Sequence, residues 1–77
     1  MPTIFKENGY RFFFFSDEYS PQHIHIEKGD SYARIEIETL KVTNNYNLNS
    51  KELKKLVSLV LANKNKLKEA WDDYFEE

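Results

Sequence analysis

The sequence predicts an α+β fold, in which an antiparallel β-meander of about four strands precedes a long C-terminal helix. Two pairs of short apolar runs are separated by the two-residue turns Asn8-Gly9 and Gly29-Asp30, which is the spacing of β-hairpins. The last third of the chain repeats its apolar residues every three to four positions, as an amphipathic helix does. We expect one domain over residues 1–77, with the sheet in 1–48 and the helical segment in 49–77.

The first hairpin is predicted from strands at residues 3–7 and 10–15. Asn8 and Gly9 both accept the positive φ angles of a type I′ turn, so the register can be counted outward from them. It pairs Phe5 with Phe12 and Ile4 with Phe13. Residues 12–15 are all Phe, so this strand is apolar on both faces and needs cover on both.

The second hairpin follows a polar loop over residues 16–22 and is predicted from strands at 23–28 and 31–38. Its turn, Gly29-Asp30, has Gly in the first position, as a type II′ turn prefers. Apolar and polar side chains alternate along both strands. One face carries Ile24, Ile26, Ala33, Ile35 and Ile37, and the other carries His23, His25, Glu27, Arg34, Glu36 and Glu38. We expect the helix on the isoleucine face and the histidines on the face away from it.

Residues 39–48 are predicted as a connector, with room for a short fifth strand near 41–43. The helix is expected to begin after Asn49, because Asn49 and Glu52 have the spacing of a capping box. One apolar stripe then runs through Leu53, Leu56, Val57, Val60, Leu67, Trp71, Tyr74 and Phe75. The stripe keeps its phase across residues 63–65, which favours one helix over two. Such a helix would be about 40 Å long, against about 17–24 Å for the strands, so it overhangs the sheet or bends or splits near Asn63.

Composition narrows the class of protein. The formal net charge of −2 does not indicate nucleic-acid binding, since domains of that kind are normally basic. The chain has no cysteine, so disulfides and thiolate metal sites are excluded. No apolar run approaches the roughly 20 residues of a membrane span, and residues 1–5 lack the features of a signal peptide. We expect a cytoplasmic protein with no membrane partner.

The candidate site is the segment P-Q-H-I-H-I-E over residues 21–27. The predicted register places His25 opposite Arg34, His23 opposite Glu36, and Glu27 beside Tyr32. Same-face neighbours on a strand lie about 7 Å apart, close enough to converge on one small ligand or ion.

Chemistry is one interpretation of this segment. His23, His25 and Glu27 could hold a divalent metal ion as a set of two histidines and one carboxylate, with Glu36 as the alternative carboxylate. Alternatively, His23 and His25 could act as base and acid on a phosphodiester, with Arg34 stabilising the developing charge.

Two interpretations in which the segment has no catalytic or metal-binding role also remain open. The histidines could contact a partner, or they could lie on a solvated sheet face where Arg34 and Glu36 satisfy them. Likewise the aromatic run at residues 12–15 could stack on bases, but core packing is the preferred interpretation.

The helical segment predicts self-association. Residues 51–68 carry six lysines and one acid, whereas residues 69–77 carry five acids and no base. The helix macrodipole disfavours this order, but two antiparallel copies would set the basic half against the acidic half. We therefore expect a homodimer through the C-terminal helix, with Trp71 near its centre. Its contact would bury Leu67, Trp71, Tyr74 and Phe75.

The landmarks together resemble a known family. They are the opening M-P-T-I, the strand G-Y-R-F-F-F-F-S, the segment P-Q-H-I-H-I-E-K-G-D with A-R-I-E-I after it, and the closing E-L-x-x-L-V and N-K-x-x-L-x-x-A-W-x-x-Y-F. This pattern is similar to the small bacterial and phage-borne domain-of-unknown-function family 4160. The family's histidine pair, Gly-Asp turn and helix-end tryptophan correspond to His23 and His25, to Gly29 and Asp30, and to Trp71. Many relatives carry a longer proline-rich loop where this chain has only residues 19–22.

The resemblance implies no established activity. Members of the family look like partners of a second small protein encoded alongside, in an arrangement similar to toxin–antitoxin pairs. We therefore expect a protein-interaction module in such a pair. The alternative is an RNA-directed, ribonuclease-like enzyme that uses His23 and His25, with or without a metal.

Overall fold

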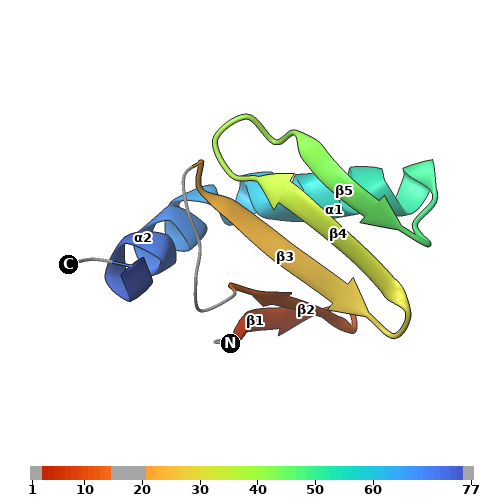
Figure 1. The fold of residues 1–77 in the computed structure, drawn as a ribbon, viewed down its shortest axis with the longest axis horizontal. Coiled ribbons are helices and arrows are strands. Elements are labelled where there is room, and N and C mark those ends of the chain that lie inside the picture. Colours follow the sequence, from red (N-terminus) through yellow and green to blue (C-terminus); the bar gives the residue numbers. More distant parts are fainter. Residues whose placement is uncertain (1–2, 15–20, 76–77) are drawn as a thin grey trace.

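The computed structural model describes residues 3–14 and 21–75. Its elements are β1 (Thr3–Glu7), β2 (Tyr10–Phe13), β3 (His23–Lys28), β4 (Ser31–Glu36), β5 (Val42–Tyr46), α1 (Ser50–Ala62) and α2 (Lys64–Phe75) (Figure 1). The α+β class and the antiparallel sheet are confirmed, but the described part of the chain has five strands and two helices where four and one were predicted. The predicted strand end at residue 15, most of the predicted loop and the last two residues of the predicted helical segment lie outside the described residues.

The strands follow one another across the sheet in the order β1-β2-β3-β4-β5, each antiparallel to the next. The first turn has the predicted type I′ signature, because φ is 55° at Asn8 and 83° at Gly9. The pairing of Phe5 with Phe12 is confirmed. The pairing of Ile4 with Phe13 is wrong, since the register shifts between Thr3 and Phe5 and Thr3 pairs with Phe13 instead.

The fifth strand is longer and later than the suggested 41–43. Its sequence, VTNNY, contains two asparagines, which are poor strand formers on their own. It forms because β4 offers a full edge to pair with, from Tyr32↔Tyr46 to Ile35↔Val42. β5 is the last strand of the described sheet, so it pairs with β4 alone.

The helical segment breaks at Asn63. The Asn63 side chain donates a hydrogen bond of 2.8 Å to the carbonyl of Leu59, which competes with the helical ladder of α1. The Asn63 carbonyl in turn accepts from the amide of Leu67, as the first bond of α2. One residue therefore ends the first helix and begins the second. The predicted capping box is present at the other end of α1, where Asn49 and Glu52 bond each other's backbone amides.

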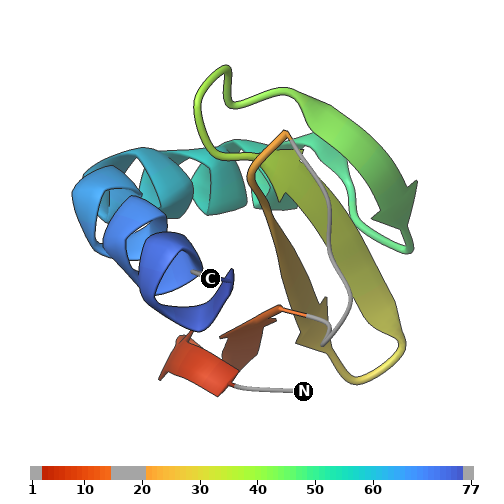
Figure 2. The ribbon, with the colours of Figure 1, turned by 60° about the vertical axis from the view of Figure 1, so that its left-hand side comes forward.

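The break allows both helices to cover the sheet. Figure 2 shows α1 and α2 on the same side of the curved sheet, and the longest dimension of the molecule is 37 Å. The buried helical residues are Leu56 and Val60 of α1 and Leu67 and Trp71 of α2. They join one core with Tyr10, Phe12, Phe14, Ile24, Ile26, Ala33, Ile35, Ile37 and Leu48. The predicted contact between the helical segment and the isoleucine face is therefore confirmed, although two helices make it.

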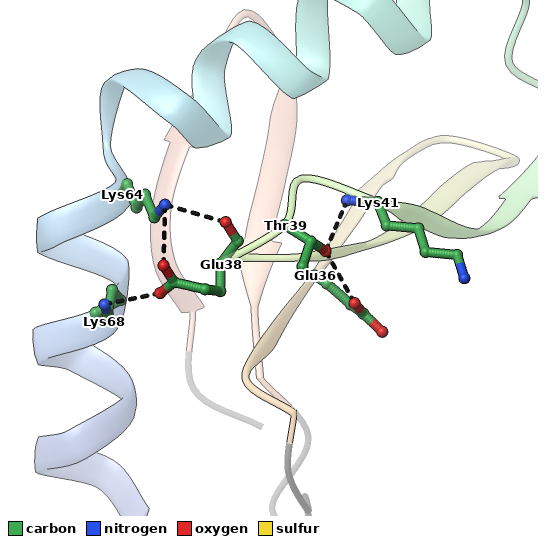
Figure 3. A network of polar contacts seen from close by, with 6 residues as sticks. All are labelled: Glu36, Glu38, Thr39, Lys41, Lys64 and Lys68. Atoms are coloured by element: carbon green, nitrogen blue, oxygen red, sulfur yellow. Dashed lines mark hydrogen bonds and ion pairs between the residues drawn. The ribbon is translucent and has the colours of Figure 1, made fainter.

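Two lysine side chains hold α2 against the residues that follow β4. In Figure 3, Lys64 and Lys68 of α2 both reach Glu38, which follows β4. The Lys68 ammonium lies 2.9 Å from the Glu38 carboxylate, and Lys64 donates to the Glu38 carbonyl at 3.0 Å.

At the N-terminus of α1, burial and the nearby carboxylate of Glu52 raise the pKa of the Tyr10 phenol. Neither described helix has the length and apolarity needed to cross a membrane.

Candidate functional site

The candidate site lies on the sheet face that bears the histidines. We call it the histidine face and define it by Arg11, Phe13, His23, His25, Glu27, Tyr32, Arg34 and Glu36. The predicted pairings of His25 with Arg34, His23 with Glu36 and Glu27 with Tyr32 are all confirmed. β2 adds Phe13 opposite His25 and Arg11 opposite Glu27.

His25 is enclosed by aromatic rings. Its ring centroid lies 5.5 Å from that of Phe13 and 6.0 Å from that of Tyr32, and it stacks with both. A hydrogen bond of 2.6 Å joins its Nδ1 to the Tyr32 hydroxyl. In the neutral Nε2–H tautomer the tyrosine donates and Nδ1 accepts. The imidazole is thereby fixed in orientation by two rings and one hydroxyl.

His23 bridges the sheet and the second helix. Its Nδ1–H donates to the carbonyl of Pro21 at 2.8 Å, so the neutral ring carries its proton on Nδ1. Its ring lies 5.0 Å from that of His25, edge to face, and 5.3 Å from that of Trp71. The Trp71 ring also packs at 5.3 Å against Phe14. Trp71 therefore links the core to the histidine pair.

Both histidines are buried, which corrects the expectation of a solvated face. His23 is 2% exposed and His25 is 3% exposed. Alternation along the strand did place them on the face away from the isoleucines. The prediction failed because Phe13 and Tyr32 flank His25 on this face, and because α2 turns back at Asn63 so that Trp71 reaches His23.

The set proposed as metal ligands is not brought together. No group of three or more His, Cys, Asp or Glu side chains within residues 3–14 and 21–75 is arranged to hold a metal ion. Glu27 is used elsewhere, because its carboxylate accepts from Arg11 Nε at 2.9 Å and pairs with Nη2 at 2.8 Å. The Arg11 guanidinium also lies 4.1 Å from the centroid of the Phe13 ring, as a cation–π contact.

Arg34 extends toward the margin of the sheet. Its Nη1 donates to Thr43 Oγ1 on β5 at 2.8 Å, and the Thr43 hydroxyl donates to the Arg34 carbonyl at 3.2 Å. The guanidinium is half-buried and, within the described part of the chain, forms no ion pair. Arg34 is thus oriented by a neutral hydroxyl and keeps its other N–H donors for further partners.

Sequence reasoning missed Phe13, Tyr32 as a partner of His25, and Trp71 as a partner of His23. Only the Tyr32 contact was accessible from a predicted register, since Tyr32 is a diagonal neighbour of His25 in the Gly29-Asp30 hairpin, within reach of an aromatic side chain. Phe13 is directly across from His25, but the loop predicted at residues 16–22, rather than a two-residue turn, separates their strands. The contact with Trp71 had no such signal, because it depends on the angle between α1 and α2.

Both histidines are engaged within the chain. Each histidine uses Nδ1 within the chain, and both rings are packed among aromatic side chains. A general acid or base must come within hydrogen-bond distance of the substrate proton. His23 and His25 are 2% and 3% exposed. Arg34 is half-buried, and Asn44 and Tyr46 of β5, on the same side of the sheet, are exposed.

Comparison with known proteins agrees with this assignment of landmarks. Residues 9–72 match the family described as Domain of unknown function (DUF4160). No curated protein and no solved structure matches the chain. The match runs from the first hairpin turn to the last turns of α2, and it includes both histidines, the Gly29-Asp30 turn and Trp71. The chain therefore belongs to the DUF4160 family.

Proposed function

We propose that this chain is a non-catalytic protein-interaction module of the cytoplasm, one half of a toxin–antitoxin-like pair with a small protein encoded alongside. The observation that carries the proposal is the burial of His23 and His25, which are 2% and 3% exposed. Side chains so enclosed contribute to the shape and stability of a binding surface more readily than to acid–base catalysis. The net charge of −2 also favours a protein partner over nucleic acid.

A hetero-partner fits better than the homodimer expected from the helical segment. That dimer was to bury Leu67 and Trp71, but both belong to the core of the single chain. Of the other two expected contact residues, Tyr74 is 43% exposed and Phe75 is half-buried. The self-complementary surface is therefore smaller than the sequence suggested.

The test is co-expression with the product of the adjacent open reading frame. We expect the two proteins to copurify in a fixed ratio and the neighbour to change the growth effect of expressing either protein alone. Two proteins that elute separately at micromolar concentration, with no effect on growth, would refute the proposal.

The ribonuclease-like alternative has one observation in its favour, the distance of 5.0 Å between the two imidazole centroids. It is tested by incubating the purified protein with total RNA, with and without a chelator, beside His25→Gln. We expect no cleavage in any arm. Cleavage by the wild type that the variant lacks would establish the enzyme instead, and sensitivity to the chelator would establish its metal-dependent form.

A further inference from the structure

We propose that β5 is the docking edge for an extended acidic segment of a partner protein, which adds as a sixth strand and places a carboxylate on Arg34. The inference rests on the proposed function and adds the surface and the chemistry of the partner. Three features of the described residues carry it: a margin strand without charge, a cation without a counter-ion beside that strand, and an exposed aromatic side chain in the same row.

The margin strand is open to pairing. Among residues 3–14 and 21–75, β5 neighbours only β4 in the sheet, so one row of its backbone N–H and C=O groups faces outward. Edges of this kind are commonly blunted by charged residues or proline, but Val42–Tyr46 contains neither. Both margin strands have one register shift, but the opposite margin differs in charge, because β1 contains Lys6 and Glu7. β5 is thus the better template for an added strand.

The Arg34 guanidinium is placed to bind a side chain of the added strand. Arg34 is paired with Asn44 across the β4–β5 ladder, and its Nη1 lies 2.8 Å from Thr43 Oγ1, so the guanidinium lies over β5. A sixth strand would run about 4.7–4.9 Å beyond β5. A carboxylate opposite Asn44 would then meet the guanidinium with a charge-assisted hydrogen bond, and that geometry suits the planar fork of arginine.

The aromatic side chain extends the same row. Tyr46 is 63% exposed and pairs with Tyr32 two residues along from Asn44, on the face that carries Arg34. Its ring can pack on an apolar or aromatic residue two positions from the acid, since alternate side chains of the added strand point to one face. The expected ligand is therefore an extended peptide with an acidic residue and an apolar residue at alternate positions.

The experiment selects peptides against the whole chain. A display library of random peptides of about twelve residues, enough for a typical strand of about five or six with flanks, is the probe. We expect enrichment of Asp or Glu at one position, and slower exchange of the β5 amides when a selected peptide binds the ¹⁵N-labelled protein. Replacing the selected acid by its amide should weaken binding about tenfold or more.

Matched variants locate the carboxylate. Arg34→Gln should remove the preference for the acidic peptide over its amide. Asn44→Glu should also remove it, because an internal carboxylate across from Arg34 would occupy the guanidinium. Asn44→Gln is the neutral control at the same exposed position and should bind within about twofold of wild type. Circular dichroism and thermal unfolding establish that each variant is folded.

Several outcomes would overturn the inference. The inference fails if the library yields no binding peptide, or if the selected peptides lack Asp and Glu. It also fails if the amides that the peptide protects lie outside β5, or if Arg34→Gln leaves the preference for the acidic peptide unchanged. A dimer that protects β5 without peptide would show that a second copy is the occupant. If the co-encoded protein binds while the β5 amides remain unprotected, this inference fails and the proposed function stands.

Discussion

The hydroxyl of Tyr32 lies 2.6 Å from Nδ1 of His25, two residues along β4 from the cross-strand partner of that histidine. The contact is diagonal across the two strands, and it packs the Tyr32 ring against His25 on the face that the sequence predicts to be solvated. His25 is 3% exposed, so its polar atoms depend on the surrounding chain for hydrogen bonds. This relationship makes the histidine pair part of the folded structure.

Tyr32→Phe should lower the free energy of unfolding by about 1–3 kcal/mol, because it removes the hydroxyl that bonds the buried His25 while preserving the ring. Urea denaturation followed by far-UV circular dichroism measures this change in the free energy of unfolding. Tyr46→Phe is the control, since Tyr46 is 63% exposed, and it should change the free energy by less than about 0.5 kcal/mol. Equal effects of the two variants would contradict the role assigned to the hydroxyl.

Trp71→Ala should lower the free energy of unfolding by about 3–5 kcal/mol, since its ring packs on Phe14 and His23 inside one chain. We expect loss of cooperative thermal unfolding or a large drop in Tm without a change of mass in light scattering of the folded fraction. Leu61→Ala, at a 56% exposed position of α1, should be nearly neutral. A Trp71→Ala chain that is stable but dissociated from a dimer would restore the dimer interpretation.

Glu38→Gln should destabilise the protein at neutral pH and lose that effect in acid. The hydrogen bond from Lys68, with the charges of Lys64 and Lys68, lowers the pKa of Glu38 from its ordinary value of 4.5. A lowered folded-state pKa stabilises the fold above the unfolded value, and that stabilisation disappears as the pH falls through the folded value. The Tm difference between wild type and variant should therefore be constant near neutrality and shrink below about pH 4.5.

The matched control for that experiment is Glu69→Gln, which makes the same charge change at an exposed position of α2. Its Tm difference should be small and should not follow the Glu38 profile. Added salt should reduce the Glu38 effect, because the pair with Lys68 is solvent-exposed. A Glu38→Gln difference that persists unchanged at pH 3 would show that the carboxylate charge is not its source.

Lys51→Glu should raise the free energy of unfolding by about 0.3–1 kcal/mol, because Lys51 stands in the first turn of α1, where the helix dipole favours negative charge. Lys55→Glu makes the same change beyond the first turn and should have a smaller effect. Chemical denaturation of both variants gives the comparison. If Lys51→Glu is the more destabilising of the two, the lysine makes a contact that the dipole argument omits.

The residues around turns and caps determined their local structure without help from the rest of the fold. Asn8-Gly9 set the first hairpin, because few residues other than Asn and Gly adopt two successive positive φ angles. Gly29-Asp30 set the register of β3 and β4, which paired His25 with Arg34 and His23 with Glu36. Asn49 and Glu52 set the start of α1. In each case the information lies within a few residues, so it is readable in the sequence.

Only the tertiary structure decided the remaining features. β5 formed from a segment with weak strand propensity, because β4 supplied an edge, and the extra residue at its bulge could not be read from the turn. The apolar stripe kept its phase through Asn63, yet the chain turned there, since the break lets Leu67 and Trp71 enter the same core as Val60. That turn also brought Trp71 onto His23. Burial of the histidines thus depends on contacts between residues nearly fifty positions apart, and the periodicity of a strand reports only which face a side chain takes, not what covers it.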